Sequence, residues 1–223
     1  MDKLKLIIIV VLLFGTVNTF SQNEKFNIGI ELGPSITFLR GNEIINEYGV
    51  AKMGYITGLT FQYNLTDAFS LKSGLTYERK GGGSEITVSD GIGTPHGVVK
   101  GKINMDYIGI PVLAKYKFGI NNMFFINGGP FIGYLMKATS MIESYKEYPS
   151  SSADDTETYK RIDLGLSLGI GLSHYLSDKI SISLEVRNNL GLLNTGENVY
   201  KDDSILTNST GLLFGITYSL PQN

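Results

Sequence analysis

Hydrophobic and polar residues alternate one by one over a long segment in the second half of the chain. From Ile162 to Leu172 every even position is a large aliphatic residue, while the odd positions hold Asp, Gly or Ser. Successive side chains of a strand point to opposite faces, so this period of two predicts a strand with one apolar and one polar wall. Residues 180–187 repeat the pattern after a short connection, which predicts a hairpin.

The same alternation predicts six further strands. They cover residues 26–40, 55–65, 69–80, 106–118, 123–139 and 210–220. The segment 123–139 alternates most weakly, because Phe125, Phe131 and Leu135 interrupt its polar wall. It is still extended and rich in glycine, so the sequence predicts eight strands in all.

Three prolines count against uninterrupted strands. Pro34, Pro111 and Pro130 lie inside predicted strands, where each removes one backbone donor. A closed ring of strands has no free edge at which that loss is harmless, so we expect a bulge or a local break at each proline.

Short and long connections alternate along the chain. The short ones cover residues 64–68, 119–122 and 177–179, and the long polar ones cover 41–52, 81–104, 140–160 and 195–209. This asymmetry is typical of outer-membrane barrels, which have short periplasmic turns and long extracellular loops. We therefore predict an all-β fold, an eight-stranded antiparallel up-and-down transmembrane β-barrel with both termini in the periplasm.

Alternation alone leaves open whether the apolar wall faces lipid or the inside of a soluble, lipocalin-like barrel. Three features favour lipid. The strands have about 11 or more residues, enough for a tilted membrane span. Gly and Ser crowd the polar wall, as a narrow lumen requires. Aromatic residues gather near the strand ends, as in the two girdles of a membrane barrel.

Six charged residues fall on the polar wall at similar heights above the short turns. Charges withdrawn from water need partners, so we predict a paired cluster that plugs the lumen rather than an open pore. A proton or ion path through the same residues is the alternative. The predicted cluster consists of Glu31, Lys72, Lys115, Lys117, Glu185 and Arg187.

The N-terminal segment has the layout of a secretory signal peptide. Lys3 and Lys5 precede an apolar run over residues 6–14, and Ser21 offers a small residue for cleavage before Gln22. An uncleaved anchor is the alternative, although the run is short for a membrane span. We predict a signal peptide over residues 1–21 and a barrel domain over 22–223.

Composition narrows the chemistry. The chain has no Cys, which excludes disulfides, thiolate metal sites and cysteine nucleophiles. Its formal charge of −2 becomes −3 when the two lysines and one aspartate of the predicted signal peptide are lost, so no nucleic-acid partner is expected.

Four parts of the chain carry a family resemblance: Asp106–Tyr116, Gly128–Leu135, Asp163–Leu166 with Gly169–Gly171, and Glu185–Arg187 with Gly191–Leu192. Through these segments, and through a signal ending in Phe20-Ser21-Gln22, the chain resembles the PorT-like outer-membrane β-barrel family of Bacteroidetes-type bacteria. The resemblance implies an outer membrane protein β-barrel domain in the bacterial outer membrane. The family's namesake is associated with protein secretion, and the family supplies no catalytic motif.

The sequence contains no recognisable catalytic motif. His96 and His174 belong to opposite ends of the predicted barrel, and neither lies beside a nucleophile motif. Glu78, Asp106 and Asp163 lie near the predicted outer rim, where they form either an acidic site or a solvated edge. We predict no enzyme activity, no catalytic residue, no cofactor and no metal.

The predicted role follows from the fold and the long connections. We predict a structural or interaction protein, surrounded by outer-membrane lipid, whose long extracellular loops meet a secretion-machinery or extracellular protein partner. A minor transporter or a lipid-active outer-membrane enzyme is the alternative.

Overall fold

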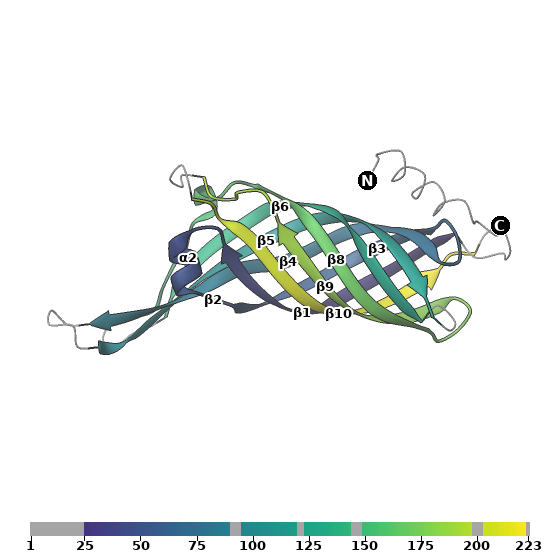
Figure 1. Ribbon diagram of the computed structural model, residues 1–223, viewed down its shortest axis with the longest axis horizontal. Helices are drawn as coiled ribbons and strands as arrows, with labels where there is room; N and C mark the ends of the chain where they lie inside the picture. Colours follow the sequence, from purple (N-terminus) through teal and green to yellow (C-terminus); the bar gives the residue numbers. More distant parts are fainter. Residues whose placement is uncertain (1–24, 90–94, 120–122, 144–148, 198–202, 222–223) are drawn as a thin grey trace, which may run out of the picture.

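The protein is built almost entirely of antiparallel strands (Figure 1). The computed structural model describes residues 25–89, 95–119, 123–143, 149–197 and 203–221. No helix in these residues is long and apolar enough to span a membrane. In chain order the elements are β1 (Phe26–Arg40), α2 (Glu43–Tyr48), β2 (Gly49–Val50), β3 (Lys52–Asn64), β4 (Phe69–Ser89), β5 (Pro95–Phe118), β6 (Phe124–Ile142), β7 (Ser151–Asp154), η2 (Thr156–Thr158), β8 (Ile162–Tyr175), β9 (Ile180–Gly191) and β10 (Leu206–Ser219).

Eight long strands pair in a closed ring. The order is β4-β3-β1-β10-β9-β8-β6-β5, and a further pairing of β5 with β4 returns to the start. Neighbours in the chain are neighbours in the ring, and β1 meets β10 to complete it, with Asn27 opposite Ser219. The predicted eight-stranded, antiparallel, up-and-down arrangement is confirmed.

The two ends of the ring differ. The connections β3–β4, β5–β6 and β8–β9 are short and lie at the same end as the start of β1 and the end of β10; we call this the short-turn end. The opposite end carries α2, β2, β7 and η2, and we call it the long-loop end (Figure 1).

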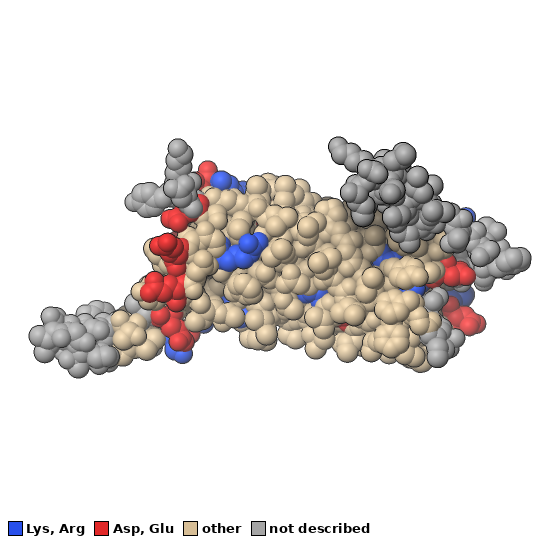
Figure 2. Space-filling model, in the orientation of Figure 1, with Lys and Arg blue, Asp and Glu red and all other residues tan. Residues whose placement is uncertain are grey.

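The apolar wall faces outward. On β8 the side chain of Leu168 is 67% exposed, whereas that of Ser167 beside it is 1% exposed. Figure 2 shows the result: the side of the molecule is mostly uncharged, and Asp and Glu side chains gather near its two ends. The alternative of a soluble barrel with an apolar interior is therefore wrong, because the charged and small residues occupy the lumen.

Aromatic side chains pair across neighbouring strands near both ends. At the short-turn end the rings of Phe26 and Tyr63 are 5.0 Å apart, and those of Phe118 and Phe124 are 5.9 Å apart. Toward the long-loop end Tyr55 stacks on Tyr77 at 5.8 Å. These pairs bound the apolar wall in the way that interfacial girdles bound the lipid-facing surface of a membrane barrel.

The prolines interrupt the ladder without changing its register. Between β5 and β6 the pairing passes from Pro111–Phe131 to Ala114–Gly128 with the same offset. Beside Pro111, the Ser73 hydroxyl donates to the Pro111 carbonyl at 2.8 Å. The β1–β10 pairing is likewise interrupted between Leu32 and Ser35, beside Pro34. The prediction of a bulge or a local break is thus met by breaks, and the register shift between β5 and β6 lies away from the prolines, between Asp106 and Tyr107.

The segment predicted as a polar loop over residues 81–104 is mostly strand. β4 continues to Ser89 and β5 begins at Pro95, so the two form a ribbon that extends beyond the ring (Figure 1). Gly81 adopts a φ of +129°, and a Cβ on Gly83 would lie only 2.8 Å from Val50 Cγ2. The glycines therefore let the ribbon bend and approach β2, rather than ending the strand.

The predicted signal peptide over residues 1–21 lies outside the described residues. The barrel strands begin at Phe26, within the predicted domain of residues 22–223.

Candidate functional site

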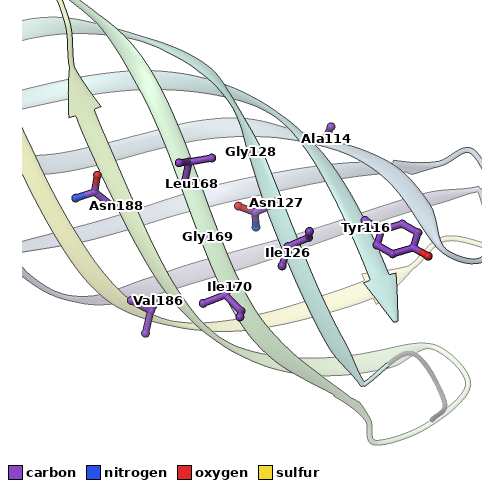
Figure 3. A pocket seen from close by; sticks show the side chains of 10 residues that line it. All are labelled: Ala114, Tyr116, Ile126, Asn127, Gly128, Leu168, Gly169, Ile170, Val186 and Asn188. Atoms are coloured by element: carbon purple, nitrogen blue, oxygen red, sulfur yellow. The ribbon is translucent and has the colours of Figure 1, made fainter. Parts of the chain in front are cut away.

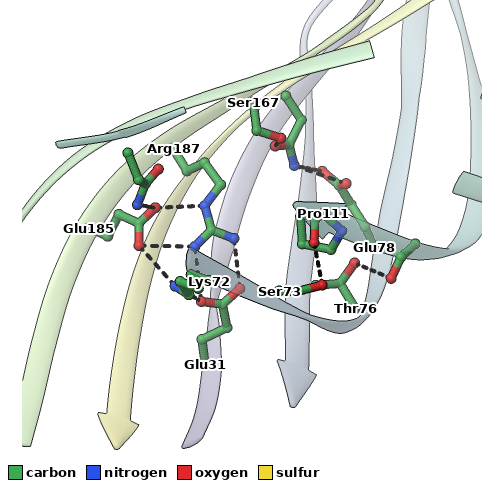
Figure 4. A network of polar contacts seen from close by, with 12 residues as sticks. Glu31, Lys72, Ser73, Thr76, Glu78, Pro111, Ser167, Glu185 and Arg187 are labelled. Carbon is green, nitrogen blue, oxygen red and sulfur yellow. Dashed lines mark hydrogen bonds and ion pairs between the residues drawn. The ribbon is translucent and has the colours of Figure 1, made fainter. Parts of the chain in front are cut away.

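Four of the six charged residues predicted to share the lumen form one compact network of ion pairs, which we call the short-turn network (Figure 4). It consists of Glu31 on β1, Lys72 on β4, and Glu185 and Arg187 on β9. Arg187 Nη1 lies 2.7 Å from Glu31 Oε1, and Arg187 Nε lies 2.6 Å from Glu185 Oε1. Lys72 Nζ lies 2.7 Å from Glu31 and 3.3 Å from Glu185.

The short-turn network is balanced in charge. It contains two carboxylates and two cations, and the Asn127 amide adds a hydrogen bond of 3.0 Å to Glu185 Oε1. Glu185 and Arg187 are each only 2% exposed. Buried charges are tolerated when they are paired and fully hydrogen-bonded, which describes this arrangement.

The other two predicted residues, Lys115 and Lys117, are also buried on the lumen side of β5 but form no ion pair with these four in the described part of the chain. Lys115 Nζ lies 3.4 Å from the Gln62 side-chain oxygen and 4.0 Å from the centre of the Phe125 ring. A cation over a ring face is stabilised by the ring quadrupole. Phe125, which weakened the alternation of β6, therefore has a place inside the lumen.

A second network lies closer to the long-loop end, and we call it the long-loop network. Its ion-paired members are Glu78 and Lys80 on β4 and Asp163 on β8. Lys80 Nζ is 3.0 Å from Asp163 Oδ2 and 3.6 Å from Glu78 Oε2. Lys80 is 2% exposed and Asp163 is 0% exposed.

Neutral donors complete the long-loop network. The Thr207 hydroxyl donates to Asp163 at 2.7 Å, and the Ser209 hydroxyl donates to Glu78. The Asn189 amide donates to Glu78 Oε2 at 3.1 Å and accepts from the Ser167 hydroxyl at 2.7 Å. With two carboxylates and one lysine, this network carries one excess negative charge, shared among these donors.

The predicted charge cluster did not include Lys80, and its partners Glu78 and Asp163 were predicted near the outer rim of the barrel. Lys80 has the same parity on β4 as Lys72 and Glu78, so the alternation already assigned it to the lumen. Its Nζ also lies 4.3 Å from the centre of the Phe131 ring, another residue that spoiled the polar wall of β6. Of the three acids considered as an open acidic site, Glu78 and Asp163 are buried with Lys80.

Asp106, the third of those acids, lies on the outer side of the ring. Arg79 donates to both of its carboxylate oxygens, at 2.6 and 2.8 Å. The three acids therefore do not form one site.

An apolar cap lies above the long-loop network. Its buried members are Leu39, Met105, Tyr107, Leu135, Ala138 and Tyr159. Between the two networks the structure leaves a cavity of about 20 Å³ beside Lys80, Tyr107 and Arg187. This is little more than the space that one water molecule needs. Side chains thus fill the lumen from the short-turn network to the cap.

A much larger cavity, of about 750 Å³, lies at the long-loop end; we call it the outer cavity. Ile44 and Tyr48 on α2 form one side, the start of the ribbon around Gly82 forms another, and Leu39 and Tyr159 lie at the cap. Burial raises the pKa of the Tyr159 hydroxyl above its ordinary value, and the charge of Asp155 adds to this, so the hydroxyl stays protonated.

A depression of about 650 Å³ lies on the outward wall, where small residues interrupt the large ones (Figure 3). Ala114 and Gly128 form its floor, with Leu168 and Ile170 beside them and Tyr116 toward the short-turn end. None of the residues that line this depression is charged, in keeping with its place on the apolar outward wall.

The histidines do not form a site together. His174 is exposed near the short-turn end of β8, and His96 lies at the far end of the ribbon on β5; the side chain of His96 is outside the described residues. Among the described residues no group of three or more His, Asp or Glu side chains has the geometry of a metal site.

Comparison with known protein families decides what kind of protein this is. The outer membrane protein beta-barrel domain family matches residues 20–197, most of the chain. The chain belongs to this family. Its location is therefore the bacterial outer membrane. The match ends before β10, which the structure nevertheless places in the ring between β9 and β1.

Solved outer-membrane barrels are similar to the chain at low sequence identity. Neisserial surface protein A is 12% identical over 87% of this chain and 97% of that one, with a TM-score of 0.45. The Outer Membrane Protein W of Escherichia coli is 12% identical over 90% and 100%, with a TM-score of 0.42. OprG of Pseudomonas aeruginosa is 12% identical over 90% and 98%, with a TM-score of 0.40. A comparison with curated proteins finds no significant match.

Proposed function

We propose that this protein is a closed outer-membrane barrel that holds a protein-binding ribbon above the membrane. The barrel is the anchor, and the ribbon formed by β4 and β5 beyond the ring is the binding element. The observation that carries this proposal is the length of these two strands, 21 and 24 residues, against 12 and 14 for β9 and β10.

The filled lumen favours a role other than the passage of ions or solutes through the ring. Two ion-pair networks and the apolar cap occupy the ring, and the cavity between the networks measures about 20 Å³. A hydrated ion or a small solute needs a continuous water-filled path. We therefore propose that the barrel does not conduct.

The ribbon offers backbone edges to a partner. The pairing of β3 with β4 ends at Tyr55–Arg79, and the β5–β6 pairing reaches only to Gly101–Ile142. β4 and β5 continue as a pair to Ser89 and Pro95. Beyond the short contact with β2, each strand of the ribbon then has one edge without a neighbouring strand among the described residues. Such edges accept an added strand from another protein.

The finer parts of the proposal follow from the sequence. With residues 1–21 as a cleaved signal peptide and the termini in the periplasm, the ribbon projects outside the cell. The resemblance to the PorT-like family of Bacteroidetes-type bacteria favours a component of a secretion machinery as the partner. N-terminal sequencing of the mature protein tests the cleavage before Gln22.

A shortened ribbon tests the binding role. Ser84 and Gly101 are directly paired, so replacing residues 85–100 with Asn-Gly closes the hairpin at that pair with a favoured two-residue turn. We expect crosslinking and pull-down from intact outer membranes to capture a partner with the full chain and to lose it with this variant. The matched control replaces Asp178-Lys179 in a short turn with Asn-Gly, and should retain the partner.

Two outcomes contradict the proposal. Capture of the same partner by the shortened variant would remove the ribbon from the interaction. A large, stable conductance of the purified protein in planar bilayers would contradict the closed barrel.

A further inference from the structure

The outer cavity is a large hollow at the long-loop end, and the proposed binding of a protein to the ribbon edges does not require it. Its volume of about 750 Å³ lies within the range of pockets that bury drug-sized ligands. The apolar cap closes its inner side through Leu39 and Tyr159, which are 9% and 7% exposed. The cavity is thus a dead end that opens at the long-loop end.

The apolar side chains that line the cavity lie at the long-loop end and not on the outward wall of the ring. Large exposed apolar residues elsewhere lie mostly on the outward wall, against the membrane. Ile44 is 72% exposed, Tyr48 is 45% exposed, and α2 buries none of its residues, although α2 lies across the long-loop end of the ring (Figure 1). A helix of this kind is stabilised when an apolar body covers its inner side.

The charged groups at the cavity already have partners. Glu85 Oε1 lies 3.0 Å from Lys100 Nζ, and Lys102 Nζ lies 3.2 Å from Glu143 Oε1. The neighbouring Glu47 carboxylate raises the pKa of the Tyr48 hydroxyl, and burial raises the pKa of the Tyr159 hydroxyl. A charged ligand therefore finds no unpaired countercharge among Glu85, Lys100, Lys102 and Glu143, whereas an uncharged ligand needs none.

We propose that the outer cavity binds an uncharged, mainly apolar small molecule, oriented by hydrogen bonds to hydroxyl groups such as that of Tyr159. The inference goes beyond partner binding by the ribbon and stands without it. The ligand is held rather than transported, because the cap and the two ion-pair networks lie beneath the cavity.

Two related dyes test both the site and the charge preference. The chain contains no Trp, so Ile44→Trp in the full chain provides a single reporter at the cavity. In nanodiscs we expect saturable quenching by N-phenyl-1-naphthylamine, which is uncharged. The sulfonated relative 1-anilinonaphthalene-8-sulfonate should bind at least about tenfold more weakly, a difference of about 1.4 kcal/mol. Equal binding of the two dyes overturns the preference for an uncharged ligand.

Matched variants separate the cavity from the membrane. The second reporter, Leu65→Trp, is at the short-turn end and should show only the weak, unsaturable quenching of dye dissolved in lipid. Thr87→Phe, on the ribbon side of the cavity, should reduce dye affinity at Ile44→Trp about tenfold by filling the space. Met53→Phe adds the same ring outside the cavity and should leave the affinity unchanged. Equal quenching of both reporters, or no effect of Thr87→Phe, overturns the proposal.

Discussion

The two buried networks compensate their buried carboxylates with different partners. The short-turn network joins two carboxylates to two cations, and Arg187 bridges both carboxylates while Lys72 contacts the same pair. The long-loop network has two carboxylates but only Lys80 as a cation, and hydroxyl and amide groups supply the remaining hydrogen bonds.

This difference separates two kinds of compensation for a buried charge. Where cations duplicate one another, the loss of one still leaves each carboxylate with a charged partner. Where one cation serves two carboxylates, its loss leaves both with dipoles alone, which compensate a buried charge less well. The long-loop network should therefore be more sensitive to the loss of a single cation.

The largest effect is expected for Lys80→Met. The substitution leaves Glu78 and Asp163 buried without a cation, and removing one partner of a buried ion pair costs about 3–5 kcal/mol. We expect a loss of stability in that range, measured by urea unfolding in lipid vesicles with the gel shift of the folded barrel as readout.

A compensating variant serves as the control for Lys80→Met. Replacing both acids together with Lys80, as Glu78→Gln, Asp163→Asn and Lys80→Met, removes all three charges at once and should recover much of the stability. A Lys80→Met barrel as stable as the wild type would show that the neutral donors suffice alone.

Arg187→Met should have the next largest effect. Glu31 keeps Lys72 at 2.7 Å, and Glu185 keeps Lys72 at 3.3 Å together with Asn127. The loss should stay near the lower end of the range for a broken buried pair, about 3 kcal/mol, in the same unfolding assay. A larger loss than that of Lys80→Met would mean that the bidentate geometry of Arg187 outweighs the duplication of cations.

The smallest effects are expected for the neutral donors, compared through one identical substitution. Asn189→Leu removes the amide from Glu78, where cations are scarce, and should cost about 2 kcal/mol. Asn127→Leu removes the amide from Glu185, which retains two cations, and should cost about 1 kcal/mol or less. Equal losses in urea unfolding would refute the idea that dipoles matter more where cations are fewer.

The fold was largely predictable because the strands obey one simple rule. An apolar residue at every second position, as from Ile162 to Leu172, predicts a strand with one apolar and one polar face, and the strand length and the aromatic residues near the strand ends favour lipid on the apolar side. The ribbon was not predictable in this way. Beyond the membrane both faces meet water, so the alternation weakens, and Gly81 to Gly83 were interpreted as a strand end although they allow close packing.

The candidate site was predictable only in part, for a related reason. Parity assigns Lys72, Lys80 and Lys115 to the lumen, and counting from the short turns gives an approximate height, but neither gives the direction and reach of each side chain. Lys115 therefore lies over Phe125 instead of joining Glu185, and Lys80 forms a network of its own. The outer cavity depends on α2 and β2. These two elements were not predicted from the sequence, because residues 41–52 were interpreted as a polar connection.

The closure of the ring by β1 and β10 has a consequence for how the chain could be rewired. Asn27 pairs with Ser219, so β1 and β10 are neighbours, and the start of β1 lies beside the end of β10 at the short-turn end. A short linker from β10 to β1, with a new break in a long-loop connection, would give a circular permutant in which every strand keeps both neighbours. The strand order is cyclic, and the seam between β1 and β10 is a gap in the covalent chain rather than in the sheet.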